Sequence, residues 1–270
     1  MKSKPFLLAA NWKMNPLTVK EAERIARGVE QGIKGINKKD FTQKIELVVF
    51  PPAVFLNCFW ESRYFKRGIQ NVHWEPRGAY TGEITTRIAE DSGCKYVIIG
   101  HSERRKYFGE NDKIVNLKLR TVLKGSLNPI VCVGETKEER DSNQTIKVIK
   151  RQLANIFDKI SVLTLPRITV AYEPVWAISS MDRSKKNLAD DPDDVMGIVI
   201  LIRKMLAQMF HSDVAERVRV IYGGSVTPKN TDDFLNLDIL DGFLVGGASI
   251  SMFDFLPIIR KVYDKQREYI

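Results

Sequence analysis

Short apolar runs alternate along the chain with segments that have the hydrophobic spacing of helices. Eight runs have the length and composition of buried strands, at residues 6–10, 45–50, 69–72, 96–99, 129–133, 168–172, 218–222 and 242–245. Because most of these runs are nearly continuous in apolar residues, they predict strands that are buried on both faces, as in a parallel sheet.

Two of the intervening segments show a helical stripe clearly. The stripe residues are Ala22, Ile25, Ala26, Val29 and Ile33 in the first segment, and Val195, Ile198, Val199, Ile202 and Leu206 in the second. Helix starts are also marked, because Asp191 precedes Pro192 and Thr227 precedes Pro228. Each pair joins a side-chain cap to a proline that suits the first helical turn.

Eight alternations of strand and helix without a linker predict an α/β protein, a closed (β/α)8 barrel in which residues 1–270 form a single domain. An open doubly wound sheet is the alternative. Against it, the Gly-x-Gly-x-x-Gly pattern of a dinucleotide site is absent after the first strand.

The composition of the chain limits where in the cell the protein is expected. No apolar segment approaches the roughly 20 residues that span a bilayer, and the apolar run 6–10 is too short for a signal peptide. The three cysteines, Cys58, Cys94 and Cys132, have no paired spacing, which disfavours disulfides and thiolate metal sites. We therefore expect a soluble cytoplasmic protein.

The formal net charge is +9, but basic and acidic residues are interspersed along the chain. The densest basic run, residues 183–186, is soon followed by Asp190 and Asp191. This pattern favours a solvated surface that steers small anions, and we expect no nucleic-acid and no membrane partner.

Polar residues gather where the predicted strands end. Asn11 and Lys13 follow the first strand, His101 and Glu103 follow the fourth, and Glu173 follows the sixth. In a (β/α)8 barrel these ends meet at one face, which is where catalytic groups lie. Pro174 biases Glu173 toward an extended backbone, so this carboxylate is expected to be held in place, as a proton-transferring base requires.

Paired glycines follow the last two strands. Gly223 and Gly224 precede Ser225, and Gly246 and Gly247 follow the eighth strand. Paired glycines allow backbone N–H groups to approach an anion at the start of a helix. Together, at strands seven and eight of a barrel, they predict a phosphate site.

Five motifs carry a resemblance to a known family. They are ANWKMN at 10–15, IGHSERR at 99–105, AYEPVWAI at 171–178, YGGSV at 222–226 and LVGGAS at 244–249. In this order and spacing the chain resembles the triosephosphate isomerases, from Phe6 to about Ile250. The resemblance implies a TIM barrel that interconverts dihydroxyacetone phosphate and D-glyceraldehyde 3-phosphate, with no cofactor and no metal.

The resemblance also implies the role of each site residue. Glu173 would carry the proton between neighbouring carbons, while neutral His101, Lys13 and Asn11 would stabilise the charge that develops on the carbonyl oxygen. Glu103 would support Lys13. The implied phosphate-binding residues are Ser179, Ser225, Gly246 and Gly247.

A homodimer is implied as well, in which the loop from Gly78 to Ile84 of one subunit packs beside Lys13 and Met14 of the other. Arg104 and Glu83 would form a structural ion pair. His73 and His211 are expected at the surface, and Cys132 is expected to fill space in the core.

The chain departs from the family after Ile178. The family has a short glycine-containing hinge at this position, whereas residues 178–191 are polar, long and without glycine. We expect an enlarged, mobile lid that closes differently over the substrate.

Two other functions remain as alternatives. An aldolase or lyase on the same barrel needs a Schiff-base lysine within a strand, and no predicted strand carries a suitable one. A catalytically weakened scaffold that binds triose phosphate is the second alternative.

Overall fold

The computed structural model describes residues 4–58, 62–177 and 191–268, and within them parallel strands close into a barrel. The strands are β1 (Phe6–Asn11), β2 (Ile45–Phe50), β3 (Phe65–Ile69), β4 (Tyr96–Ile99), β5 (Asn128–Val133), β6 (Thr169–Tyr172), β7 (Arg219–Tyr222) and β8 (Gly242–Val245). Each strand pairs with the next in the sequence, and β8 pairs with β1. The predicted closed barrel is therefore confirmed.

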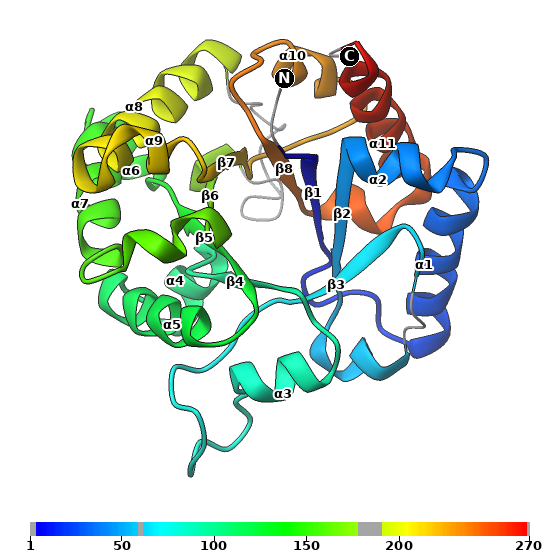
Figure 1. Cartoon of the computed structure of the whole chain (residues 1–270), viewed down its shortest axis with the longest axis horizontal. Coiled ribbons are helices and arrows are strands. Elements are labelled where there is room, and N and C mark those ends of the chain that lie inside the picture. Colours follow the sequence, from blue (N-terminus) through cyan, green and yellow to red (C-terminus); the bar gives the residue numbers. More distant parts are fainter. Residues whose placement is uncertain (1–3, 59–61, 178–190, 269–270) are drawn as a thin grey trace.

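Helices surround the barrel on its outer side (Figure 1). The α-helices are α1 (Val19–Ile33), α2 (Lys38–Lys44), α3 (Thr86–Asp91), α4 (Ser102–Phe108), α5 (Asp112–Lys124), α6 (Lys137–Asp141), α7 (Thr145–Ile156), α8 (Pro192–Phe210), α9 (Ser212–Ala215), α10 (Thr231–Leu235) and α11 (Met252–Arg267). Short 3-10 helices are η1 (Ala53–Cys58), η2 (Val162–Arg167), η3 (Val175–Ala177) and η4 (Gly247–Ile250).

Both faces of the strands are buried, as their composition predicts. One set of side chains fills the barrel interior, and it comprises Leu7, Ala9, Val48, Phe50, Tyr96, Ile98, Ile130, Cys132, Ala171, Ile221 and Leu244. The alternate set packs outward against the helices, where α1 buries the whole predicted stripe from Ala22 to Ile33. The interior is thus a filled core, and open space for a ligand is left to the strand ends.

Two elements differ from the sequence prediction by more than one residue. The third strand is Phe65–Ile69 instead of residues 69–72, because Lys66 and Arg67 interrupt the apolar pattern of the strand itself. Asp191 does cap α8 by accepting the N–H of Asp193. Thr227, by contrast, precedes a turn, and α10 begins later with Asn230 at its N-cap.

The segment between β3 and α3 projects from the barrel, as Figure 1 shows. His73 at its base is buried, in contrast to the surface position predicted for it, since its ring lies against Trp74 and Tyr80 with centroid distances of 4.0 and 4.4 Å. His211 is exposed as predicted.

The predicted ion pair between Arg104 and Glu83 is not formed within the chain. Arg104 instead contacts Glu110, which is buried and also receives the Lys118 ammonium. Glu83 lies 3.7 Å from Nδ1 of His73. The sequence prediction was wrong here because Glu110 is nearer to Arg104 along the same helix–loop unit.

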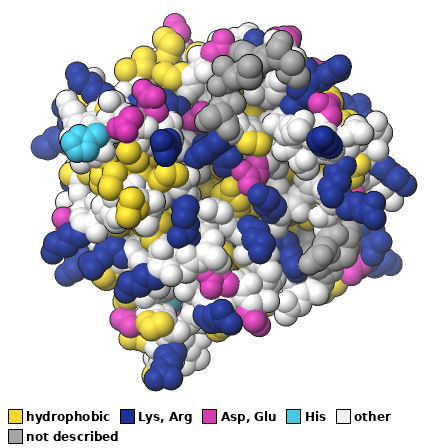
Figure 2. All heavy atoms as spheres, viewed as in Figure 1, with side chains coloured by type: hydrophobic (Ala, Val, Ile, Leu, Met, Phe, Trp, Pro, Cys, Tyr) yellow, Lys and Arg dark blue, Asp and Glu magenta, His cyan; other side chains and the backbone are white. Residues whose placement is uncertain are grey.

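On the molecular face that Figure 2 displays, Lys and Arg side chains are spread widely, with acidic and uncharged residues between them. This distribution agrees with the alternation of charge along the sequence. Among the described residues, no helix is long and apolar enough to cross a membrane.

Candidate active site

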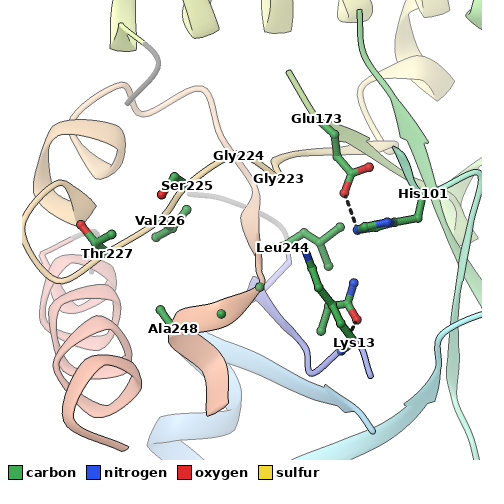
Figure 3. Close-up of a pocket in the computed structure, with 13 residues that line it drawn as sticks. Lys13, His101, Glu173, Gly223, Gly224, Ser225, Val226, Thr227, Leu244 and Ala248 are labelled. Carbon is green, nitrogen blue, oxygen red and sulfur yellow. Dashed lines mark hydrogen bonds and ion pairs between the residues drawn. The ribbon is translucent and has the colours of Figure 1, made fainter. Parts of the chain in front are cut away.

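A pocket lies where the strands end, and it collects residues from several loops (Figure 3). Its lining comprises Asn11, Lys13, His101, Glu173, Gly223, Gly224, Ser225, Val226, Thr227, Leu244, Gly246, Gly247 and Ala248. Most site residues predicted from the sequence therefore share one cavity. In Figure 3 the side chains of Glu173 and His101 point toward each other, and Lys13 lies near them, across the pocket from the loop that carries Ser225 and Val226.

The imidazole of His101 is oriented by the helix that follows it. His101 is the N-cap of α4, and its Nδ1 accepts a hydrogen bond of 3.2 Å from the backbone N–H of Glu103. A ring nitrogen that accepts a hydrogen bond carries no proton, so the proton of the neutral ring is on Nε2. This arrangement directs an N–H donor into the pocket.

Glu173 is buried, with 2% of its surface exposed, and both of its oxygens have partners. Oε1 lies 3.2 Å from Nε2 of His101, and Oε2 accepts the N–H of Ser102 at 3.0 Å. Its backbone is held too, because the Glu173 N–H donates to the carbonyl of Val133 at 2.7 Å. The carboxylate is therefore fixed beside a donor, and its side chain is largely shielded from solvent.

Lys13 has an unusual backbone. Its φ angle is +55°, in the left-handed region that non-glycine residues seldom adopt. Asn11 Oδ1 accepts the Lys13 N–H at 3.1 Å, and Gln70 Nε2 donates to the Lys13 carbonyl at 2.7 Å. Gln70 also donates to the carbonyl of Phe50. These hydrogen bonds hold the strained residue in place from both sides.

The side chain of Lys13 reaches across the pocket floor. Its Nζ lies 2.8 Å from Oε1 of Glu103, and both side chains are largely shielded from solvent. A Cβ atom placed on Gly246 would lie 3.6 Å from the same Nζ. The ammonium thus lies between its carboxylate partner and the loop that follows β8.

The opposite side of the pocket is formed by backbone. Asn230 donates from Nδ2 to the carbonyl of Ser225 at 2.8 Å, and Ser249 Oγ donates to the carbonyl of Gly246 at 2.7 Å. Gly247 begins the short helix η4. Nearby N–H groups and the Lys13 ammonium make this side suitable for an anion.

Ser179, the other phosphate-binding residue predicted from the sequence, lies outside the described residues, as do positions 178–190 of the predicted lid.

Glu135, which follows β5, holds the residues that lead into that lid segment. It is fully buried and accepts hydrogen bonds from Tyr172 Oη at 3.2 Å and from Trp176 Nε1 at 3.1 Å. Burial raises the pKa of the Glu135 carboxyl above its usual value, although its hydrogen bonds and Arg140 oppose this shift. The chain is thereby anchored just before residue 178.

Cys132 lies inside the barrel as predicted. Burial, and next the charge of Glu173, raise the pKa of the Cys132 thiol well above its usual value. The thiol is therefore protonated near neutral pH and fills space.

Sequence reasoning missed two groups that shape the pocket. Gln70 was assigned to a strand, but it follows β3 and uses its side chain to hold Lys13. Ser102 contributes through its backbone N–H, which no side-chain pattern reveals. Its place directly after the N-cap residue His101 was the available signal, since such N–H groups lack helical acceptors.

Comparison with known proteins gives a consistent result. The model of the triosephosphate isomerase family matches residues 6–262. The chain is 38% identical over 256 residues to the triosephosphate isomerase of Alkaliphilus oremlandii, covering 94% of this chain and 98% of the relative. For that of Endomicrobium trichonymphae the identity is 40% over 257 residues, covering 94% and 97%. For that of Chloroflexus aurantiacus it is 40% over 256 residues, again covering 94% and 97%. The chain therefore belongs to the triosephosphate isomerase family.

Proposed function

We propose that Glu173 is the base that moves a proton between the two carbons of a triose phosphate. As a member of its family, the protein is an isomerase of dihydroxyacetone phosphate and D-glyceraldehyde 3-phosphate. In the proposed route the Glu173 carboxylate takes a proton from the carbon beside the carbonyl, which leaves an enediol(ate). The hydroxyl proton passes to the former carbonyl oxygen, and the carboxylic acid of Glu173 returns its proton to the neighbouring carbon, so that the carbonyl forms on the other carbon.

The developing charge on the substrate oxygen requires donors. Nε2–H of His101 is one donor, and because Nδ1 already accepts the Glu103 N–H, the ring acts as a neutral imidazole. The Lys13 ammonium and the Asn11 amide complete the group of donors. Glu103 supports Lys13 through its 2.8 Å ion pair.

The observation that carries this proposal is the contact of 3.2 Å between His101 Nε2 and Glu173 Oε1 at the pocket wall. A base and a donor at hydrogen-bonding distance can act on adjacent atoms of one small substrate. When a carbonyl oxygen takes the Nε2–H, the Glu173 carboxylate loses that partner and becomes available to the proton on carbon.

The phosphate of the substrate would occupy the side formed by Ser225, Gly246 and Gly247, with Ser179 as the contribution of the lid. Supporting this, the strand-seven and strand-eight loops line the same cavity as Lys13. Backbone N–H groups and one ammonium neutralise a phosphate without competing for the proton that is transferred.

The direct test is a coupled assay with D-glyceraldehyde 3-phosphate and no added metal, which detects the dihydroxyacetone phosphate formed. We expect turnover by the wild type and loss of turnover by Glu173→Gln. Binding of the triose phosphate without turnover by the wild type would support the catalytically weakened scaffold instead. Cleavage to smaller products would support an aldolase or lyase.

A homodimer through the loop from Gly78 to Ile84 is part of the proposal. Met14 is 86% exposed and Leu17 is 83% exposed in the loop after β1, and Tyr80 is 45% exposed in the projecting segment after β3. Apolar side chains exposed on neighbouring loops favour contact with a second copy. A partner loop at Met14 would also cover the strained Lys13 backbone.

We further propose that residues 1–270 form one domain that functions in the cytoplasm, in glycolysis and gluconeogenesis. Support for one domain comes from α11, which packs on α1, α2 and β1 after the barrel has closed. Cys94 and Cys132 are free thiols, as expected of a reducing compartment.

A further inference from the structure

Arg105 binds two backbone carbonyls at the point where β4 leaves the sheet. Its Nε donates to the carbonyl of Gly100 at 2.8 Å, and its Nη2 donates to that of Cys132 at 3.4 Å. The last pair between β4 and β5 is Ile99 with Val131, so Gly100 and Cys132 are the next two positions. The guanidinium therefore takes the place of ladder hydrogen bonds beyond the end of β4.

The backbone makes this replacement necessary. Gly100 has a φ angle of +69°, which turns the chain out of the sheet directly before His101. A Cβ atom on Gly100 would lie 2.9 Å from Val115 and 3.3 Å from Nη2 of Arg105, so the turn is closely packed. Without Arg105, the two carbonyls would lose this donor in a largely buried location.

Each of these carbonyls is one residue away from a group that holds the pocket. Gly100 immediately precedes His101. Cys132 immediately precedes Val133, whose carbonyl accepts the backbone N–H of Glu173 at 2.7 Å. One planar guanidinium therefore connects the strand end that carries His101 to the strand end that holds Glu173.

Arg105 is itself held in place. Its Nη1 lies 2.8 Å from Oδ1 of Asp112 at the start of α5, and the two side chains are only 18% and 13% exposed. Arginine presents its donors in a rigid plane, so fixing one edge through Asp112 aims the remaining N–H groups at the carbonyls. Lysine cannot offer the same set of directions.

We propose that Arg105 is a positioning residue that sets the separation and orientation of the His101 imidazole and the Glu173 carboxylate. This inference rests on the proposed roles of those two residues. Figure 3 shows their side chains facing each other from separate elements, joined by one contact. Since catalysis depends on placement to within about 1 Å, a shift of either strand end lowers the rate of proton transfer.

The competing explanation is that Arg105 only stabilises the fold by tying α4 to α5. Arg151 provides a matched control for it. Its Nε lies 3.7 Å from the other oxygen of Asp112, and its Nη2 lies 3.6 Å from Glu139. Among its contacts in the described parts of the chain there is no hydrogen bond to Gly100 or Cys132. Arg151→Met therefore perturbs the same carboxylate without touching the strand ends.

The experiment compares Arg105→Met, Arg105→Lys and Arg151→Met with the wild type in the isomerase assay. For Arg105→Met we expect kcat to fall roughly 10- to 100-fold while KM changes less than about threefold. The kcat of Arg105→Lys should fall roughly tenfold, because a single ammonium replaces the planar set of donors. The kcat of Arg151→Met should stay within about twofold of the wild-type value, since this change leaves both carbonyls hydrogen-bonded to Arg105.

A spectroscopic measurement separates positioning from stability. The chain has three histidines, so the imidazole ¹⁵N signals of His101 can be assigned readily. In the wild type and in Arg151→Met we expect the neutral form with its proton on Nε2. In Arg105→Met the two nitrogens should shift toward averaged values, because the ring is no longer held in one orientation.

Wild-type kcat and unchanged His101 signals in folded Arg105→Met would overturn the inference, even if the unfolding temperature fell. Should Arg105→Met fail to fold, Arg105→Lys and Asp112→Asn give the same test, with wild-type kcat in both again overturning it. An inactive wild type would instead contradict the proposed function, so the two failures are distinguishable.

Discussion

A Cβ atom on Gly134 would lie only 1.8 Å from the backbone carbonyl oxygen of Glu173. The end of β5 therefore packs directly on the backbone of the proposed base, and only glycine leaves enough room. This close approach and the hydrogen bond from the Glu173 N–H to Val133 together fix the backbone from which the carboxylate side chain extends.

Gly134→Ala should consequently displace Glu173. Because the opposing atom is backbone, it cannot rotate away, and we expect a loss of about 2–3 kcal/mol in the free energy of unfolding together with a lower kcat. Gly197→Ala is the control, since nothing in the described chain lies within 4 Å of its added Cβ in α8. That change should raise stability by about 1 kcal/mol. Urea unfolding and steady-state kinetics check both, and equal behaviour of the two variants would contradict the steric argument.

The ion pair of Lys13 and Glu103 should matter for rate more than for folding. Glu103→Gln keeps the backbone N–H that holds His101 but removes the charge 2.8 Å from the ammonium. We expect kcat/KM to fall roughly 10- to 100-fold, in line with a lost charged hydrogen bond. Asp141→Asn removes a partner of similar geometry from the exposed Lys137 and serves as the control. If Glu103→Gln were as active as Asp141→Asn, Lys13 would not depend on its partner.

The buried carboxyl of Glu135 predicts a specific pH dependence. Its pKa is raised above 4.5, chiefly by burial, so the folded chain holds this proton more tightly than the unfolded chain does. The Glu135 contribution to the free energy of unfolding is therefore largest at acidic pH, and it falls as pH rises through the raised pKa of the folded chain. As pH rises from acidic toward neutral values, Glu135→Gln should therefore become more stable relative to the wild type. Denaturation at several pH values measures this difference.

Glu138 provides a contrast of opposite sign. Hydrogen bonding to backbone N–H lowers the pKa of the exposed Glu138 carboxyl, so its contribution is lost as pH falls. As pH rises, Glu138→Gln should therefore become less stable to unfolding relative to the wild type. A parallel response of the two variants would show that burial of Glu135 is not the cause.

The proposed dimer predicts that Met14→Glu yields a monomer. Met14 is 86% exposed in the single chain, and a carboxylate there would lose hydration in an apolar contact. Sedimentation equilibrium should show the mass of one chain, with reduced activity because the neighbouring Lys13 loses its support. Val54→Glu, at another exposed apolar position after β2, should leave the mass unchanged and is the control. A Met14→Glu dimer with full activity would contradict the interface.

The barrel and the main pocket residues could be predicted because both depend on local signals. Buried strands are visible as apolar runs, and Lys13, His101 and Glu173 each lie within two residues of a strand end. The topology then brings the strand ends together without further information. Strand β3 escaped prediction because Lys66 and Arg67 interrupt its apolar pattern.

Long-range contacts between side chains and backbone could not be predicted in this way. Gln70 binds the carbonyl of Lys13, 57 positions away, and Arg105 binds that of Cys132, 27 positions away. Carbonyl acceptors are the same at every residue, so the sequence does not indicate which one is used. The sequence also does not indicate which of several nearby charged residues will form an ion pair. Arg104, for example, contacts Glu110 instead of Glu83.

The central claim is that Glu173 transfers the proton, and the rate of Glu173→Gln tests it most directly. Glutamine keeps the shape of the side chain but cannot act as the base at this position. The account predicts a loss of roughly 10²- to 10⁴-fold or more in kcat, with urea unfolding close to that of the wild type. Turnover near the wild-type rate by the folded variant would contradict the assignment of Glu173 as the base.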